Sequence, residues 1–239
     1  MLNYLKRRIL GLTVMRGIRR SRALAKVRPV KMTEGFTLTT FDWVFTPTWE
    51  ASERREMARM MQNCDLFVDI GANHGFYSVM ADYLGKPSLA IEPEPTNLDI
   101  LRLNTPGKRI EVIACAVGDE SGSMPLFGDH DTASPRAEWH NEGFFRQTVP
   151  VETLDNLLGA RYPEGRLLIK IDVEGAEDAV LAGAKDTLRR PSEWMIETMP
   201  VMPSGEPSLA YYRVFEIMSG AGFQARLING SKTNWLFER

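Results

Sequence analysis

"FVDIGANHGFYS", from Phe67 to Ser78, is the stretch of sequence that decides the fold. A buried-strand sequence runs into a turn bracketed by Gly71 and Gly75, and an apolar helix start follows. In an open α/β sheet, ligands bind beyond the carboxyl ends of the strands, near the point where the strand order reverses. We therefore predict that the turn from Asp69 to Gly75 contacts a ligand.

The same alternation of strand and helix continues along the chain. We predict apolar strands at 66–70, 88–93, 110–118, 166–175 and 192–198, with helical runs after the first, second, fourth and fifth. Buried parallel strands lack alternation of apolar and polar residues, and short strands that alternate with helices indicate a doubly wound sheet. The predicted fold is therefore α/β and Rossmann-like, a mostly parallel sheet with helices on both faces.

Three further segments complete this outline. "FQARLI" and "NWLFE", separated by "NGSKT", predict an antiparallel C-terminal hairpin at one edge of the sheet. "PTWEASERREMARMMQN" predicts a helix with Ser52 as its N-cap. Residues 119–150 read as an irregular run, and a loop of that length inside a compact domain is usually functional.

Residues 1–33 differ in charge from the rest of the chain. They hold ten Lys or Arg residues and no acid, whereas the other 206 residues hold 19 basic and 31 acidic groups, a net charge of −12. We predict a basic N-terminal helical extension over 1–33 and one domain over 34–239. The apolar residues of the extension recur at helical spacing but fall short of the ~20 that a membrane span needs.

Three roles are compatible with this extension. They are an amphipathic helix on an anionic membrane surface, a solvated helix packed on the acidic body or a protein partner, and an organelle transit peptide. Nucleic-acid binding is disfavoured because Tyr4 is the only aromatic residue of the extension. The chain has two cysteines and no C-x-x-C pair, so we expect no disulfide framework, no structural zinc and a reducing, cytoplasmic location, with membrane-surface association left open.

The residues of the turn discriminate between two nucleotide-type ligands. A dinucleotide site needs G-x-G-x-x-G, and this pattern started at Gly71 places Asn73 where the middle glycine belongs. Asp69 would also point a carboxylate toward a phosphate. S-adenosylmethionine has no phosphate and carries a cationic sulfonium and amino group, which an acid attracts. We therefore predict S-adenosylmethionine as the cofactor and disfavour an NAD-dependent oxidoreductase.

Further residues of the β-α-β frame are expected to contact this cofactor. Gly71 and Gly75 let the backbone pass close beside its methionine part. Glu92 ends the second predicted strand, 17 residues after Gly75, where its carboxylate can accept both ribose hydroxyls. The predicted cofactor-binding residues are Asp69, Gly71, Asn73, Gly75, Glu92 and Val117.

"FVDIGANHGFYS", "AIEPEPTNLDILRLN" and "LLIKIDVEGAEDAVLAGA" together resemble the FkbM-type methyltransferase family, within the class I S-adenosylmethionine-dependent enzymes. The resemblance runs from about Trp49 to Thr198. It implies O-methylation of a hydroxyl on a sugar, a glycan or another small natural product, and methylation at nitrogen is the alternative. Its motif positions fall on Asp69, Gly71, Asn73, Gly75, Glu92, Asp172, Glu174 and Gly175.

Methyl transfer needs an aligned acceptor and a group that takes its proton. We predict Asp172, at the end of the fourth strand, as the general base or hydroxyl acceptor; its alternative role is to cap the following helix. Glu174 would share a face with Asp172 if the strand continued. His74 is a further candidate base, or a side chain that packs over the cofactor. Glu197, which ends the fifth strand, is expected to line the pocket.

The remaining alternatives concern a metal and a role without catalysis. His130 and His140 lie in the irregular run, and the spacing of "GDHDT" around His130 matches no standard ligand set, so we predict a solvated lid and no metal site. A non-catalytic module that docks through its basic extension would keep the same fold. Asp69, Glu92 and Asp172 argue against that alternative, because a module without catalysis has no need of all three acids.

Overall fold

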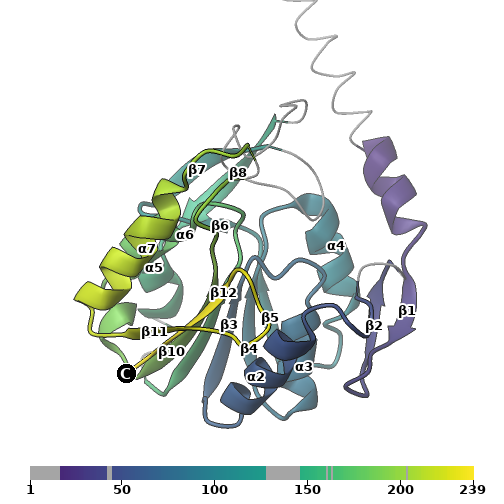
Figure 1. The fold of residues 1–239 in the computed structure, drawn as a ribbon. Coiled ribbons are helices and arrows are strands. Elements are labelled where there is room, and N and C mark those ends of the chain that lie inside the picture. Colours follow the sequence, from purple (N-terminus) through teal and green to yellow (C-terminus); the bar gives the residue numbers. More distant parts are fainter. Residues whose placement is uncertain (1–16, 42–44, 128–145, 160, 163, 203) are drawn as a thin grey trace, which may run out of the picture.

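The computed structural model of the chain describes residues 17–41, 45–127, 146–159, 161–162, 164–202 and 204–239. Its centre is a sheet formed by β3 (Leu66–Ile70), β4 (Ser88–Ile91), β5 (Ile110–Ile113), β9 (Leu167–Ile171), β10 (Ser192–Glu197), β11 (Gln224–Leu227) and β12 (Asn234–Glu238). The strand order is β11-β12-β10-β9-β3-β4-β5 (Figure 1). Neighbours from β10 to β5 are parallel, whereas β12 is antiparallel to both β10 and β11. The predicted sheet and its C-terminal hairpin are confirmed.

Helices cover both faces of this sheet (Figure 1). On one side lie α5 (Leu154–Gly159), α6 (Glu177–Ala182) and α7 (Leu209–Gly220), and a short 3₁₀ turn, Thr187–Arg189, follows α6. On the other side lie α2 (Ala51–Met61), α3 (Phe76–Tyr83) and α4 (Pro95–Leu103). The strand order reverses between β3 and β9, so a ligand site is expected at the carboxyl ends of these two strands.

The alternation of side chains along β3 and β9 determines which side chains face each side of the sheet near this site. Val68 joins the apolar core under α5, α6 and α7, whereas Phe67 and Leu168 join the core under α2 and α3. Residues two apart on a strand share a face. Asp69 and Lys170 therefore point toward the α2–α3 side, where they are register partners on adjacent strands.

One predicted strand and one predicted loop are corrected. The strand predicted over 110–118 is two strands in different sheets, because β6 (Ala116–Val117) leaves the large sheet and pairs with β8 (Arg146–Glu152). β8 also pairs with β7 (Gly122–Phe127), which gives a small sheet in the order β6-β8-β7. Residues of β5 and of β6 both pack against apolar neighbours, so the sequence stays apolar from one strand to the next. The apolar pattern therefore gives no sign that the chain changes sheet between them. Most of the described part of the predicted loop 119–150 is consequently strand, and residues 128–145 lie outside the described part of the chain.

Two local predictions are also wrong. The N-cap of α2 is Glu50, at φ 43°, and Ser52 lies in the first helical turn. β9 ends at Ile171, and Glu174 has φ 52°, a left-handed conformation that cannot continue a strand. Asp172 and Glu174 therefore belong to a loop and do not share the face of one strand.

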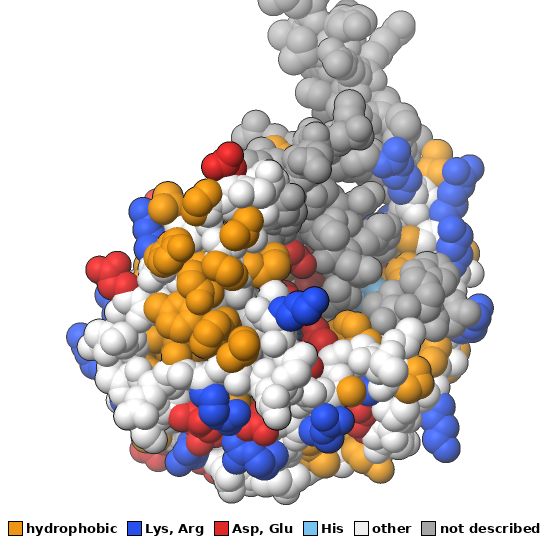
Figure 2. All heavy atoms as spheres, in the orientation of Figure 1, with side chains coloured by type: hydrophobic (Ala, Val, Ile, Leu, Met, Phe, Trp, Pro, Cys, Tyr) orange, Lys and Arg blue, Asp and Glu red, His pale blue; other side chains and the backbone are white. Residues whose placement is uncertain are grey.

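The first described residues contact the main domain. Residues 17–24 are helical, and β1 (Arg28–Lys31) pairs with β2 (Thr37–Thr40), so the predicted boundary after residue 33 falls inside this hairpin. Arg20 forms an ion pair with Asp99 of α4, which attaches the helical residues to the domain. Lys and Arg side chains are grouped on this side of the molecule (Figure 2). Among the described residues, no helix combines the length and the apolar character that crossing a membrane requires.

Candidate active site

The turn after β3 has the backbone conformation that its glycines predict. Gly71, Asn73 and Gly75 have positive φ angles of 81°, 52° and 87°. A Cβ atom at Gly71 would lie 1.8 Å from the carbonyl oxygen of Asp172, so only glycine fits there. The turn therefore packs its backbone directly against the loop that follows β9, and it brings two motifs about a hundred residues apart into contact.

Glu92, which directly follows β4, ties this turn to the next one. Its carboxylate accepts hydrogen bonds from the backbone N–H groups of Asn73 and Glu94, both at 2.8 Å. Burial raises the pKa of Glu92 to about 8, even though both N–H donors act in the opposite direction. Glu94 in turn caps α4 by accepting from the N–H groups of Thr96 and Asn97. Glu92 is thus held rigidly at the carboxyl end of β4.

Three cavities lined by described residues adjoin this turn. The largest of the three lies over the carboxyl ends of β3, β4 and β9 and contains about 690 Å³ of space free of atoms, including the part open to solvent. Val117 of β6 and Leu126 of β7 form its wall toward the small sheet. Of the predicted cofactor residues, it is lined by Gly71, Asn73, Glu92 and Val117. None of the described residues that line it is Lys, Arg or His, whereas Glu92, Asp172 and Glu174 are acids. This chemistry suits a cationic ligand without phosphate and opposes a dinucleotide.

Asp69 and Gly75 hold the turn from outside the largest cavity. Asp69 is buried, and its Oδ2 accepts a hydrogen bond from the Ser78 hydroxyl at 2.6 Å. Burial raises the pKa of Asp69, and the nearby Lys170 opposes that shift. Gly75 is the N-cap of α3, and a Cβ there would lie 2.5 Å from the Leu101 side chain. Both residues therefore contribute to the shape of the turn.

A second cavity, of about 330 Å³, adjoins the first on the α2–α3 side. Its walls are the aromatic rings of Phe45, Trp49, Phe76 and Tyr77. Charged side chains are also present, because Asp69, Lys170 and Asp172 line the same space. It shares Gly71, Asn73 and Asp172 with the largest cavity.

A third cavity, of about 240 Å³, lies between the loops after β9 and β10. Its charged residues are all acids: Asp172, Glu174, Glu177 and Glu197. Burial, and then the charge of Asp172, raises the pKa of Glu197 to about 8. Burial likewise raises the pKa of Glu177 to about 7, although its carboxylate accepts the Gly175 N–H at 2.8 Å.

Asp172 lines all three cavities. Its Oδ2 accepts a hydrogen bond from Lys170 Nζ at 2.7 Å, and its side chain remains 28% exposed. The alternative role of Asp172 as a helix cap is wrong, since the N-cap of α6 is Ala176. A carboxylate at this junction can contact both a cofactor and an acceptor.

The prediction of His74 as a catalytic base is not supported by its place in the structure. Its side chain is fully buried, and Nδ1 lies 2.7 Å from the Thr40 hydroxyl of β2. The ring packs edge-on against Phe41 and Phe45. His74 is absent from the linings of the three cavities, so it joins the turn to the β1–β2 hairpin. We remove it from the catalytic candidates.

Sequence reasoning missed four residues of this site. Lys170, Tyr77, Trp49 and Glu50 lie around the second cavity or bond to residues that line it. One signal was present, because "LLIKI" contains a single charged residue in an otherwise apolar strand. A buried lysine requires acidic partners, which directs attention to the acids at neighbouring strand ends. His130 and His140 lie outside the described residues, so the prediction that they form no metal site stays a prediction.

The fold and this site together define a methyltransferase that uses S-adenosylmethionine. Residues 69–225, more than half of the chain, match the Methyltransferase FkbM domain, and the chain belongs to this family. The predicted family and cofactor are therefore confirmed.

Other known proteins are similar to parts of this chain. Methyltransferase sdnD of Sordaria araneosa is 25% identical over 204 residues, which cover 70% of this chain and 76% of that protein. A putative O-methyltransferase from Klebsiella pneumoniae is 12% identical, with 82% of this chain and 81% of that chain covered and a TM-score of 0.47. Cofactor-bound Rv0187 from MTB is 14% identical, with 82% of each chain covered and a TM-score of 0.48.

Proposed function

We propose that this enzyme transfers the methyl group of S-adenosylmethionine to a hydroxyl group of a sugar, a glycan or another small natural product. The observation that carries the proposal is the position of Asp172, a partly exposed carboxylate in the wall common to all three cavities. A hydroxyl must lose its proton as it takes a methyl group, and a carboxylate within reach can accept that proton.

The largest cavity is assigned to the cofactor. Gly71 and Asn73 present backbone to it, Glu92 provides a fixed carboxylate for hydroxyl groups, and Val117 provides an apolar wall. S-adenosylmethionine supplies a methyl group on a positively charged sulfur, which becomes an uncharged thioether when the methyl group passes to the acceptor oxygen. Asp172 takes the acceptor proton, so the negative charge of this carboxylate is neutralised as the cationic charge of the cofactor is lost.

The acceptor is assigned to the neighbouring cavities that Asp172 also lines. The aromatic rings of Trp49, Phe76 and Tyr77 line one of them and offer flat apolar surfaces of the kind that sugar rings contact. Glu174 and Glu197 line the other, where they can accept hydrogen bonds from further hydroxyl groups. These carboxylates also favour an amine, which keeps N-methylation as the second candidate function.

The test is to incubate the full chain with S-adenosylmethionine carrying an isotope-labelled methyl group and with a panel of hydroxylated glycans and amino sugars. We expect a product that is heavier by one methylene and carries a labelled methoxy group in its NMR spectrum. Label recovered only on nitrogen would refute O-methylation and establish the second candidate.

Variants connect this activity to Asp172. Asp172→Asn should lower turnover by about 10²–10⁴-fold, the usual contribution of a positioned base. The matched control is Asp186→Asn, which changes an exposed acid outside the three cavities and should retain full turnover. Turnover unchanged in Asp172→Asn would exclude Asp172 as the base.

A further inference from the structure

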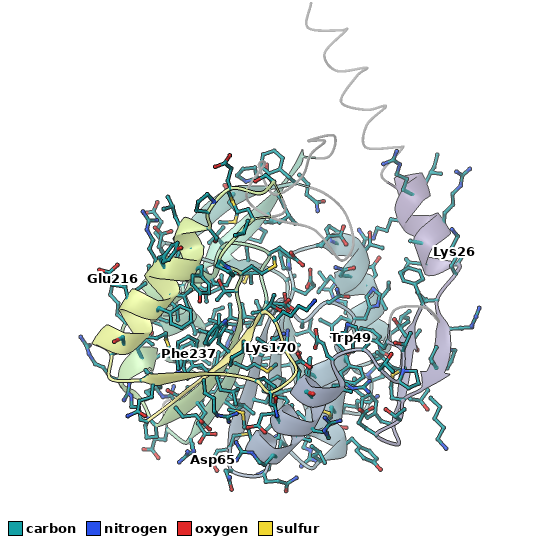
Figure 3. The ribbon with its side chains drawn as sticks, in the orientation of Figure 1. Lys26, Trp49, Asp65, Lys170, Glu216 and Phe237 are labelled. Atoms are coloured by element: carbon teal, nitrogen blue, oxygen red, sulfur yellow. The ribbon has the colours of Figure 1, made fainter. Side chains whose placement is uncertain are left out.

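Lys170 is a lysine in the middle of a buried parallel strand. It lies on β9, between Asp69 of β3 and Met195 of β10, and its side chain is 4% exposed. Both Lys170 and Trp49 lie near the centre of the molecule (Figure 3). A buried ammonium group is unfavourable by several kcal/mol unless good partners surround it. The partners of Lys170 therefore explain why the charge is tolerated, and they indicate its role.

These partners come from every element that packs around the lysine. The Nζ atom donates to Asp172 Oδ2 at 2.7 Å and lies 5.2 Å from the centre of the Tyr77 ring of α3. Burial lowers the pKa of Lys170, but neighbouring acids reverse this and raise it above its ordinary value. In order of effect, these acids are Asp172, Glu50, Asp69 and Glu197. They lie after β9, before α2, on β3 and on β10, so one ammonium group is surrounded by four carboxyl groups.

In this arrangement the acidic groups outnumber the single ammonium group at the junction of the cavities. Burial raises the pKa of Glu50 and of Asp69, and in both cases Lys170 is the strongest influence in the opposite direction. Tyr77 adds a hydrogen bond to Glu50 Oε2 at 2.5 Å. Without the ammonium group only like charges would remain, so these carboxyl groups together would hold more protons than they do beside Lys170.

We propose that Lys170 is a positioning residue for methyl transfer: its ammonium group holds the Asp172 carboxylate in place at the junction of the three cavities, and it limits the number of protons that the neighbouring acids Glu50, Asp69 and Glu197 hold. Lys170 engages Oδ2 of Asp172, and the acceptor hydroxyl uses Oδ1. The lysine acts through Asp172 and does not itself contact the reacting atoms. This inference rests on the proposed role of Asp172 as proton acceptor.

The test uses binding alone and needs no acceptor. Calorimetry of S-adenosylmethionine binding to the full chain, in two buffers of different ionisation enthalpy at neutral pH, gives the number of protons released per cofactor bound. Lys170→Met should release up to about one proton more than the wild type, because the cationic cofactor displaces the proton that replaces the lost ammonium charge. S-adenosylhomocysteine, which lacks the sulfonium charge, should displace less of it.

Two further variants separate this role from a structural one. Lys170→Arg keeps the positive charge and should release as many protons as the wild type. Lys170→Met fills similar space without the charge, so a difference between the two variants reports the charge and not the packing. Lys185→Met removes an exposed lysine and should match the wild type. Equal proton release in the wild type and a folded Lys170→Met variant would overturn the inference.

Asp172→Asn provides a second test if Lys170→Met does not fold. With Lys170 retained and one acid removed, the remaining acids hold fewer protons, so proton release should fall below that of the wild type. Release equal to the wild type would show that Asp172 and the neighbouring acids do not influence one another's protons, which overturns the charge cluster that the role of Lys170 requires. If proton release shows no effect in these variants but the wild-type enzyme still gives a labelled methoxy product, only the role of Lys170 is overturned and the proposed function stands.

Discussion

A Cβ atom at residue 71 would lie 1.8 Å from the carbonyl oxygen of Asp172, so the cofactor turn and the loop with the predicted base touch backbone to backbone. Gly71 therefore sets the distance between the turn that we assign to the cofactor and the loop that contains Asp172. The close approach also gives Gly71 a structural reason that does not depend on contact with a ligand.

Gly71→Ala should therefore lose both stability and cofactor affinity. A left-handed conformation of a residue with a Cβ is unfavourable by about 1–2 kcal/mol, and the contact with Asp172 forces the two loops apart in addition. We expect cofactor affinity in calorimetry to fall at least about tenfold, the equivalent of 1.4 kcal/mol.

The control for this prediction is Gly107→Ala. Gly107 has φ 75°, but a Cβ there would meet nothing within 4 Å, so only the conformational penalty remains. Thermal unfolding should shift modestly in this variant, with cofactor affinity unchanged. Equal losses in the two variants would show that the contact with Asp172 has no effect.

Glu197 should make stability depend on pH. Folding raises the pKa of this carboxyl from 4.5 to about 8, so the folded state holds its proton more tightly than the unfolded state does. Its stabilising contribution is complete below pH 4.5 and is lost as the pH rises toward about 8. Glu197→Gln removes this titration, so the free energy of unfolding should fall less steeply across that range.

Urea denaturation of the cofactor-free protein at a series of pH values measures this slope. Glu206→Gln changes an exposed glutamate and should reproduce the wild-type slope. A Glu197→Gln slope that coincides with the wild type would mean that Glu197 titrates similarly in both states.

Tyr77→Phe should lower the stability of the protein while the aromatic wall of the second cavity is kept. The variant keeps the ring beside Lys170 but removes the hydroxyl that donates to Glu50 at 2.5 Å. Glu50 is partly buried, and a carboxyl group that loses its donor there is unfavourable by up to about 1–3 kcal/mol, the range for a fully buried group. Chemical denaturation should show a loss of this size. Tyr212→Phe, at a ring that is 58% exposed, is the control and should leave stability unchanged.

The basic N-terminal side of the molecule should bind anionic membranes. Arg22 and Lys26 are exposed there, and Figure 2 shows Lys and Arg side chains grouped on this side. We propose that the full chain co-sediments with vesicles of phosphatidylserine and phosphatidylcholine, more weakly as salt increases, because exposed charges are screened within about 10 Å at 0.1 M salt.

Replacing Arg22 and Lys26 together by Glu should weaken this co-sedimentation. Arg189→Glu, at an exposed arginine of the 3₁₀ turn, is the control and should bind as the wild type does. Equal binding to vesicles of phosphatidylcholine alone would exclude an electrostatic attachment.

Much of the fold could be predicted because its signals are local. Apolar runs marked the parallel strands, and the glycines of the first turn marked the switch point at β3. The strand predicted over 110–118 failed because β5 and β6 are both apolar, and only the pairing partner on β8 separates them. Partner choice is a long-range property that no local pattern carries.

The same distinction between local and long-range signals applies to the candidate site. Gly71, Asn73, Glu92 and Asp172 belong to recognisable motifs and line the largest cavity. Lys170 was missed because its role depends on Glu50, which precedes α2, and on Tyr77 of α3, and no local pattern links these residues to β9. The sequence left His74 as either a base or a packing side chain, and it could not decide between them because the partner Thr40 lies 34 positions earlier in the chain, on a hairpin that the motif does not include.

The small sheet β6-β8-β7 forms one wall of the largest cavity and has an apolar cluster of its own. That cluster consists of Ala116, Leu126, Val149 and Val151, and none of these residues belongs to the cores on either face of the parallel sheet. Val117 of β6, by contrast, joins the core under α5, α6 and α7, so the wall is anchored to the main sheet at one end. Substitution within the small cluster can therefore reshape the wall of the cavity while both main cores keep all of their members.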